Sequence, residues 1–319
     1  MSSARRATNT DLGMFNAASF NSSILIASLN TMAEFIIEDK DLASLNGKVI
    51  IVTGGSSGIG LATVNLLLAE GASVVNADIQ APAEEPQGSY TFVKTNVAVW
   101  AEQVALFKKA KEVYGRIDHV FANAGVGPRA DYLSTEVDEN GDPKEPSHLL
   151  LDVSLNGVIN SATLAIFHMR QQPEGGSIVI TGSTTGLQRL RAVDYAAAKH
   201  AVLGIGRGLV PLLGAANLPI RVNTLAPSWA DSSVLPGLKG LLEAIGVELM
   251  PASAVARGAA LLMADESRNG NLIHVQLGKY KEIDEAVLLP AFESIKGPDY
   301  PSEDEVLRRL QELAASNKA

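Results

Sequence analysis

The chain has no cysteine among its 319 residues, which excludes disulfides, thiolate catalysis and metal sites with cysteine ligands. Charged residues are also scarce at 19%, below the roughly 25% of an average soluble domain. No apolar run approaches the ~20 residues of a membrane-spanning helix, so we expect no membrane span. The chain has 26 basic and 35 acidic residues, which gives a net charge of −9. This charge argues against a nucleic-acid partner, because nucleic-acid-binding proteins usually carry a basic face.

What the chain has in quantity is apolar and small residues. Hydrophobic residues make up 46% of it, and 28 residues are glycine. This composition is typical of a globular protein with a large core and argues against a largely disordered chain. The five histidines show no spacing typical of metal ligands, so we expect no metal site.

Residues 1–31 differ from the rest of the chain. They are rich in serine, alanine and asparagine, and Arg5, Arg6 and Asp11 are their only charged residues. We expect residues 1–41 to form a disordered N-terminal extension of a cytoplasmic protein. A serine-rich leader that carries arginine and few acids is also typical of mitochondrial transit peptides, so mitochondrial targeting stays open.

From residue 48 onward, short apolar runs alternate with segments of helical periodicity. The runs predict strands at 48–52, 73–77, 90–94, 118–122, 177–181, 220–225 and 272–277. The clearest helices are predicted at 61–68, 101–114, 148–171 and 195–213. Such alternation is typical of βαβ units, and continuous apolar strands are typical of a parallel sheet covered on both faces. The fold class we predict is α/β: a single Rossmann-type, doubly wound parallel sheet with helices on both faces, formed by residues 42–278.

Residues 279–319 form a predicted C-terminal appendage. A capping box of Ser302 and Glu305 begins its helical part. An apolar stripe at helical spacing follows, consisting of Val306, Leu307, Leu310 and Leu313. We expect a short amphipathic helix that docks on the body or on another subunit.

A glycine-rich turn joins the first predicted strand to the first predicted helix. Gly54, Gly58 and Gly60 let the backbone approach a pyrophosphate closely, and the N–H groups at the start of the helix point at that anion. Asp78 ends the second predicted strand, where its carboxylate can accept hydrogen bonds from both ribose hydroxyls of a dinucleotide. Because the same carboxylate repels a 2′-phosphate, the sequence predicts NAD rather than NADP as the cofactor.

These features occur together with further motifs, and the set resembles the short-chain dehydrogenase/reductase family. The motifs follow the family's order: Thr53-Gly54…Gly58-Ile59-Gly60, Asn123-Ala124-Gly125, Ser183, Tyr195-Ala-Ala-Ala-Lys199 and Ile220-Arg-Val-Asn223…Pro227. The segment 269–277 and the Lys199-His200 pair are most similar to the branch that contains 15-hydroxyprostaglandin dehydrogenase.

Tyr195 and Lys199 are spaced one helical turn apart. A free tyrosine has a pKa of about 10, and a cation on the same helix face stabilises its phenolate, so we expect Lys199 to lower the pKa of Tyr195. The resemblance implies that Tyr195 is the general acid/base, that Ser183 positions the substrate oxygen and that Lys199 also holds the nicotinamide ribose. Thr184 takes the role of Ser183 if the alignment shifts by one residue.

The resemblance also implies a set of cofactor-binding residues spread over the ends of several strands. They are Thr53, Gly54, Ser57, Gly58, Ile59, Gly60, Asp78, Asn96, Val97, Asn123, Ala124, Gly125, Tyr195, Lys199, Pro227 and Ser232. Two positions depart from the family pattern. Ser154 stands where the family has a catalytic asparagine that anchors a proton-relay water, and Ser228 stands where a glycine follows Pro227. We expect Ser154 to weaken or reroute proton relay without removing the hydride chemistry.

The activity predicted from these residues is NAD-dependent interconversion of a secondary alcohol and a ketone. Residues 229–250, where the family carries its substrate lid, are strongly apolar and favour a small hydrophobic alcohol or ketone as substrate. Packing of these residues against the core or a subunit is an equal alternative. Because family members are commonly dimers or tetramers, we expect a homo-oligomer. Two other functions stay open: a non-catalytic dinucleotide-binding regulator that kept the fold, and an NADP-dependent ketone reductase.

Overall fold

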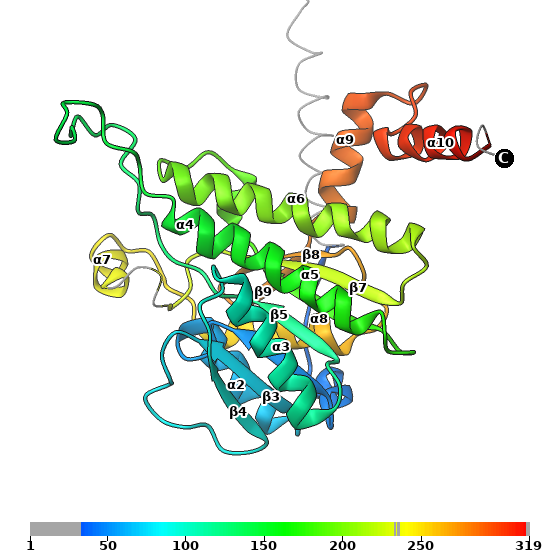
Figure 1. The fold of residues 1–319 in the computed structure, drawn as a ribbon, viewed down its shortest axis with the longest axis horizontal. Coiled ribbons are helices and arrows are strands. Elements are labelled where there is room, and N and C mark those ends of the chain that lie inside the picture. The colour runs from blue at the N-terminus through cyan, green and yellow to red at the C-terminus, as the bar shows by residue number, and fades with distance from the viewer. Residues whose placement is uncertain (1–32, 233, 235–236, 317–319) are drawn as a thin grey trace, which may run out of the picture.

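The structure, a computed structural model, describes residues 33–316 except 233, 235 and 236. A nine-stranded sheet in the order β1-β9-β8-β7-β6-β5-β2-β3-β4 runs through its centre (Figure 1). The strands are β1 (Glu34–Phe35), β2 (Val49–Thr53), β3 (Ser73–Asp78), β4 (Tyr90–Lys94), β5 (His119–Ala122), β6 (Gly176–Thr181), β7 (Ile220–Pro227), β8 (Leu272–Gln276) and β9 (Lys279–Glu282). Strands β2 to β8 are parallel, and the strand order reverses between β2 and β5. This confirms the predicted doubly wound parallel sheet.

Helices cover both faces of the sheet. The α-helices are α2 (Gly58–Ala69), α3 (Trp100–Tyr114), α4 (Leu149–Leu151), α5 (Gly157–Met169), α6 (Val193–Ala215), α7 (Leu238–Ala244), α8 (Ala252–Ala264), α9 (Leu289–Lys296) and α10 (Glu303–Ser316). Short 3₁₀ segments are η1 (Asp39–Leu45) and η3 (Thr184–Leu187), and π-helical segments are η2 (Asp152–Asn156) and η4 (Asp284–Leu288). Helices α3, α5 and α6 lie on one face, and α2 and α8 lie on the other (Figure 1).

The apolar run of β2 shows why strands here lack an alternating pattern. Ile50 and Val52 point into the core beneath α2 and α8, whereas Ile51 points into the core beneath α3 and α5. All five residues of β2 are buried, because each face of the strand meets a helical layer.

The continuous helical segment Leu149–Met169, formed by α4, η2 and α5, is long and apolar enough to cross a membrane by length and composition alone. This corrects the expectation that no apolar segment reaches that length. Here the segment packs against α3, α6, β5 and β6, and Val158, Ala165 and Met169 are buried in that contact. Core helices of globular proteins commonly have this length and composition, so the segment does not by itself indicate a membrane span.

Both ends of the predicted domain extend further than the sequence suggests. Strand β1 pairs antiparallel with β9, which itself pairs antiparallel with β8. Phe35 stacks on Tyr280 with ring centres 5.8 Å apart, and the segment η1 packs on α8. Residues 33–41 and 279–282 are therefore part of the sheet and its cover. The two-residue strand β1 is too short to give a periodic sequence signal. Residues 1–32, which include most of the predicted extension, lie outside the described residues.

His119 is a buried histidine at the opposite end of β5 from Asn123. Its Nδ1 lies 2.7 Å from the hydroxyl of Ser177, and within the described part of the chain its Nε2 has no hydrogen-bond partner. Burial lowers the pKa of His119 to about 3, although the neighbouring carboxylate of Asp118 acts in the opposite direction. The neutral imidazole is thus the form that the fold accommodates.

We expect His119 to make the fold sensitive to acid. Because its pKa in the fold, about 3, lies below the ordinary 6.5, the unfolded chain binds the proton more readily. The stabilisation is complete above pH 6.5 and is lost as the pH falls toward 3, at up to about 1.4 kcal/mol per pH unit. The glutamine of His119→Gln can keep the hydrogen bond to Ser177. In this variant, the free energy of unfolding measured with urea should depend less on pH between pH 6.5 and 4 than in the wild type. His148→Gln, at an exposed position, is the control. If the free energy of unfolding changes equally with pH in the wild type and both variants, His119 does not have this role.

Candidate active site

The turn between β2 and α2 has the shape of an anion cradle. Gly54 and Gly58 have φ angles of 67° and 49°, which residues with side chains rarely adopt. A Cβ on Gly60 would overlap the carbonyl oxygen of Gly54, so only glycine fits there. Helix α2 begins at Gly58, and the side chain of its N-cap residue, Ser57, makes no capping hydrogen bond. The first N–H groups of α2 are thus available to a phosphate, and the residues present fit the pyrophosphate of a dinucleotide.

Asp78 lies beside this cradle, at the C-terminal end of β3. Its Oδ2 accepts a hydrogen bond from the backbone N–H of Ser56 at 3.1 Å, and its Oδ1 accepts one from Gln80 at 3.3 Å. The side chain is partly exposed, so lone pairs remain for a ligand. The structure thus brings Asp78 to the place that its predicted role requires.

One residue that the sequence analysis missed, Asn76, supports the glycine turn. The buried amide of Asn76 donates hydrogen bonds to Ser56 Oγ at 3.0 Å and to Tyr90 Oη at 2.8 Å. A Cβ on Gly55 would overlap the same amide, so the turn packs directly against the Asn76 side chain. A signal was present in the sequence: Asn76 is a polar residue in the middle of an otherwise buried strand.

Side chains tie together the C-terminal ends of three central strands. Thr53 Oγ1 accepts hydrogen bonds from the backbone N–H groups of Asn123 at 3.0 Å and Ala124 at 3.1 Å. Asn123 Nδ2 donates to the carbonyl of Thr53 at 3.1 Å, and Asn123 Oδ1 accepts from Thr181 Oγ1 at 3.2 Å. These bonds fix the edge of the sheet at which open parallel sheets bind their ligands.

Asn96 and Val97, the residues predicted beside the adenine, lie after β4. The side-chain oxygen of Asn96 accepts a hydrogen bond from the N–H of Ala98 at 3.0 Å, so it is already used inside the turn. Val97 is buried against Gly157, where a Cβ would press on the valine side chain. Both side chains are therefore engaged in contacts within the fold.

The three predicted catalytic side chains come together at the C-terminal end of β6. Ser183 is the N-cap residue of η3, and its hydroxyl accepts the N–H of Thr185 at 3.1 Å and lies near enough to the phenol of Tyr195 to lower its pKa. Lys199 Nζ lies 5.8 Å from the centre of the Tyr195 ring and donates to the carbonyl of Thr181 at 2.7 Å. The hydroxyls of Ser183 and Thr184 both lie near the carbonyl of Pro227, at 3.5 and 3.4 Å. Only Ser183 acts on the pKa of Tyr195, which favours Ser183 over Thr184 as its partner.

Burial governs the titration of this group. It lowers the pKa of the Lys199 ammonium to about 8. It also raises the pKa of the Tyr195 phenol, against the opposing effect of the hydrogen bond from Ser183. The expected net fall in the pKa of Tyr195 is therefore not found for the protein alone, because burial raises that pKa and Lys199 is not among the groups that shift it. The phenol is protonated at neutral pH, and it needs added positive charge to act as a base.

Ser154 is fully buried in the π-helical segment η2. Its Oγ accepts a hydrogen bond from the backbone N–H of Val126 at 3.1 Å, directly after the Asn123–Gly125 motif. Asn156, two residues further on, is bonded to Asp152 at 3.2 Å on the outer surface. The structure thus gives the Ser154 hydroxyl a role in holding the loop that follows β5.

Asp194, next to Tyr195, is a second residue that the sequence analysis missed. It is 1% exposed and accepts hydrogen bonds from the backbone N–H groups of Arg129 at 2.8 Å, Ala130 at 3.0 Å and Tyr195 at 2.8 Å. Burial raises the pKa of this carboxyl, but the three N–H donors outweigh burial and hold the pKa below its usual value. The carboxylate joins the loop after β5 to the first turn of α6. Its sequence signal was weak, because acids are common in the first turn of a helix.

We expect Asp194→Ala to lower kcat by roughly tenfold to a hundredfold, because three buried N–H groups lose their acceptor and Tyr195 loses its fixed position. The temperature of unfolding should fall as well. Dissociation of NADH, measured by its fluorescence, should change little, since the glycine turn is intact. Asp131→Asn, at an exposed position of the same loop, is the control. Unchanged kcat in Asp194→Ala would contradict this positioning role.

The end of β7 carries the last predicted cofactor residues. The carbonyl of Pro227 lies 3.5 Å from the hydroxyl of Ser183. Ser228 has no positive φ angle and donates its N–H to the carbonyl of Val275 at 2.9 Å, so replacing the family's glycine here causes no strain. Ser232 is partly exposed on the way to α7.

Residues 229–250, the predicted substrate lid, are joined at their two ends by backbone hydrogen bonds and are apolar between them. Backbone hydrogen bonds join Met250 to Trp229 and Asp231, at 3.1 and 2.9 Å. Within the lid, Leu242 is buried, but Leu241 and Ile245 are 67% and 72% exposed. Core packing therefore accounts for only part of its apolar character.

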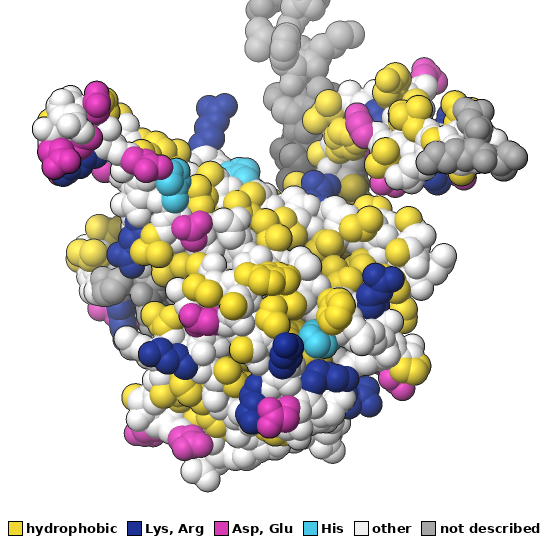
Figure 2. All heavy atoms as spheres, viewed as in Figure 1, with side chains coloured by type: hydrophobic (Ala, Val, Ile, Leu, Met, Phe, Trp, Pro, Cys, Tyr) yellow, Lys and Arg dark blue, Asp and Glu magenta, His cyan; other side chains and the backbone are white. Residues whose placement is uncertain are grey.

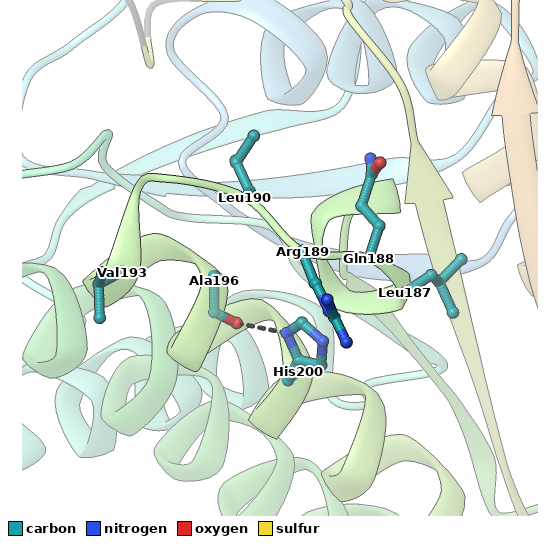
Figure 3. Close-up of a pocket in the computed structure, with 7 residues that line it drawn as sticks. All are labelled: Leu187, Gln188, Arg189, Leu190, Val193, Ala196 and His200. Atoms are coloured by element: carbon teal, nitrogen blue, oxygen red, sulfur yellow. Dashed lines mark hydrogen bonds between the residues drawn. The ribbon is translucent and has the colours of Figure 1, made fainter.

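A hollow of about 450 Å³ flanks the catalytic helix (Figure 3). It is lined by the segment Leu187–Leu190 and, on α6, by Val193, Ala196 and His200. His200 Nδ1 lies 2.8 Å from the carbonyl oxygen of Ala196. Ala196 and His200 lie about 100° and 140° around α6 from Tyr195, so the hollow lies beside the catalytic group rather than at it.

The fold and site together define a Rossmann-type oxidoreductase built to hold a nicotinamide dinucleotide. The chain belongs to the short chain dehydrogenase family, whose model matches residues 48–238. It is 50% identical to the short-chain dehydrogenase/reductase ascJ of Acremonium egyptiacum, over 90% of this chain and 99% of that protein. It is 34% identical to the short-chain dehydrogenase/reductase prx4 of Penicillium roqueforti, over 80% and 75% of the two chains.

Solved structures show the same fold. The 3-ketoacyl-(acyl-carrier-protein) reductase of Brucella melitensis, complexed with NADH, has a TM-score of 0.64 at 24% identity, over 74% of this chain and 99% of its own. The finer resemblance to the branch of 15-hydroxyprostaglandin dehydrogenase stays a prediction, since these relatives are named at family level.

Proposed function

We propose that the protein is an NAD-dependent oxidoreductase that interconverts a secondary alcohol and a ketone on a small hydrophobic substrate. The observation that carries this proposal is the meeting of Ser183, Tyr195 and Lys199 at the sheet edge beside the glycine turn. Tyr195 is the general acid/base of the reaction.

The roles of the three side chains follow from their contacts. A bound nicotinamide supplies the hydride acceptor or donor and, when oxidised, a positive charge. The Ser183 hydroxyl lies near enough to the Tyr195 phenol to lower its pKa, so a substrate oxygen can contact both. In oxidation the phenolate form of Tyr195, favoured by the positive charge of the oxidised nicotinamide, takes the proton of the substrate hydroxyl, and in reduction the phenol gives that proton to the substrate oxygen. Lys199 uses one of its three N–H donors on the carbonyl of Thr181, which leaves two for the nicotinamide ribose.

NAD is the proposed cofactor because of Asp78. Its carboxylate lies beside the glycine turn, where a ribose would follow a pyrophosphate bound at α2. A negative charge at that place supports NAD over NADP, which carries a 2′-phosphate. The Brucella melitensis reductase, a structural neighbour, was solved with NADH.

A hydrophobic substrate is proposed because of the lid. Its exposed apolar side chains, Leu241, Ile245 and Trp229, are not used by the core. Closure of such a lid over a ligand would bury them against apolar surface.

The purified protein should reduce NAD with at least one member of a panel of hydrophobic secondary alcohols, followed by absorbance of NADH. NADH binding is measured in parallel by fluorescence. Binding without turnover of any alcohol or ketone would favour the regulator. Turnover with NADPH but not NADH would favour the NADP-dependent ketone reductase.

We also propose a homo-oligomer located in the cytoplasm. Exposed apolar side chains on the outer faces of α5 and α6, including Ile159, Phe167 and Leu212, support association, and hydrophobic side chains are visible over these helices (Figure 2). Sedimentation of the full chain tests the first point.

A further inference from the structure

A series of hydrogen-bonded polar side chains lies behind Asp78, on the face of the sheet that α2 covers. Asn76 is fully buried in the middle of β3, and its Nδ2 donates to Ser56 Oγ at 3.0 Å and to Tyr90 Oη at 2.8 Å. Ser56 belongs to the glycine turn, and its backbone N–H donates to Asp78 Oδ2 at 3.1 Å. The series therefore runs from β4 through β3 to the turn and ends at the carboxylate that we propose selects the cofactor.

The direction of these hydrogen bonds is fixed at the Tyr90 end. Burial raises the pKa of the Tyr90 phenol against the effect of the Asn76 hydrogen bond, and the carboxylates of Glu85 and Asp78 raise it further. The phenol is therefore protonated at neutral pH, and its proton is drawn towards these two negative charges. The lone pairs of Tyr90 Oη are left for Asn76, which accordingly turns its amide nitrogen, rather than its oxygen, to the two hydroxyls.

This direction leaves one polar atom of Asn76 unpaired. Within the part of the chain that the structure describes, Asn76 Oδ1 is buried and has no hydrogen-bond partner. An unpaired buried acceptor is unfavourable, so a native fold that keeps one calls for a reason. The opposite direction would pair this oxygen with both hydroxyls, but it would also use the proton of Ser56. The observed direction thus keeps that proton free.

The Ser56 hydroxyl is left as a hydrogen-bond donor beside an acceptor. Its oxygen accepts from Asn76, and its O–H forms no hydrogen bond within the described residues. Ser56 and Asp78 are both partly exposed, and the backbone contact between them keeps the two side chains together. A ribose hydroxyl both donates and accepts and therefore matches this pair, whereas an ionised 2′-phosphate offers negatively charged acceptor oxygens.

We propose that Tyr90 and Asn76 are positioning residues for cofactor choice: they hold the Ser56 hydroxyl as a donor beside Asp78, and this pair recognises the 2′-hydroxyl of the adenosine ribose. The inference rests on the proposed role of Asp78 in selecting NAD. It adds three residues, none of which belongs to the predicted cofactor-binding set. Cofactor preference then depends on a phenol that acts through a buried amide.

Tyr90→Phe tests this dependence, because it removes one oxygen and leaves the ring in the core. Without the phenol oxygen, the amide of Asn76 can reverse and take the free proton of Ser56. We expect the dissociation constant of NADH, measured by fluorescence titration, to rise about threefold to tenfold, and that of NADPH to stay within about twofold. An NADH analogue that lacks the adenosine 2′-hydroxyl should bind the wild type and Tyr90→Phe equally.

Tyr114→Phe is the matched control. The phenol of Tyr114 lies 3.0 Å from the hydroxyl of Thr91, which follows Tyr90 in β4, and it packs with the core on the opposite face of the sheet. This variant also loses one phenol oxygen that contacts the strand, so its unfolding temperature should fall by a similar amount. Its dissociation constants for both cofactors should equal those of the wild type.

A double variant separates positioning from a general loss of structure. Ser56→Ala removes the donor itself and should weaken NADH binding by about tenfold. Added to Ser56→Ala, Tyr90→Phe should have no further effect, because its effect passes through the Ser56 hydroxyl. Additive losses, or equal losses for NADH and NADPH, would overturn the inference.

The same titrations distinguish this inference from the proposed function. A wild-type protein that prefers NADPH would refute the proposed cofactor and this inference together. A preference for NADH that Tyr90→Phe leaves unchanged would refute only the inference.

Discussion

Replacing Tyr195 with phenylalanine should lower kcat on the order of 10³-fold and leave the dissociation constant of NADH within about threefold of its wild-type value. The phenol lies beside Ser183 and Lys199, so its oxygen is the one able to exchange a proton with the substrate. The ring itself remains in Tyr195→Phe, and the glycine turn on the other side of the sheet edge is unchanged.

Steady-state turnover and NADH fluorescence, measured on the same preparation, separate the two effects. Tyr300→Phe is a matched control, because Tyr300 is 63% exposed on the C-terminal arm. Turnover of Tyr195→Phe close to that of the wild type would remove Tyr195 from the role of acid/base. A parallel loss of NADH binding would mean that the substitution disturbs the whole site.

The second large effect concerns cofactor choice. The wild-type protein should bind NADH at least about 100-fold more tightly than NADPH, which corresponds to roughly 2.7 kcal/mol. The reason is that a 2′-phosphate would approach the carboxylate of Asp78, which two backbone N–H groups hold in place. In Asp78→Ser this preference should fall to within about tenfold, through weaker NADH binding and tighter NADPH binding.

Fluorescence titration of both cofactors measures this preference without knowledge of the substrate. Glu84→Ser removes a charge from an exposed position after β3 and serves as the control for general electrostatics. If Glu84→Ser shifts the preference as far as Asp78→Ser, the effect is long-range. If neither variant shifts it, Asp78 does not select the cofactor.

Most of the α/β domain could be predicted from the sequence, because its signals are local. The strand after Gly47 is a continuous apolar run, and the turn that follows it needs glycines at the positions where φ is positive or a Cβ would clash. The spacing of Tyr195 and Lys199 on one helix face is also a local property. Each of these features is decided by residues a few positions apart in the chain.

The supporting residues of the site could not be predicted in the same way. Asp194 bonds to residues about 65 positions away, and Ser154 bonds to Val126 across 28 positions. The sequence around Asp194 or Ser154 does not indicate which residues will become its hydrogen-bond partners. The same holds for β1, whose two residues become a strand only because β9 lies beside them.

The sequence by itself determined the succession of the central strands and helices and the glycine turn, since periodicity and spacing encode them, and its resemblance to a family supplied the proposed catalytic side chains. Only the tertiary structure decided how these side chains behave. It gave Lys199 a hydrogen bond to the carbonyl of Thr181, and burial raised the pKa of Tyr195 where spacing alone predicted a fall. The physical reason is that desolvation depends on everything that packs around a group, whereas spacing along a helix fixes only which neighbours lie on the same face.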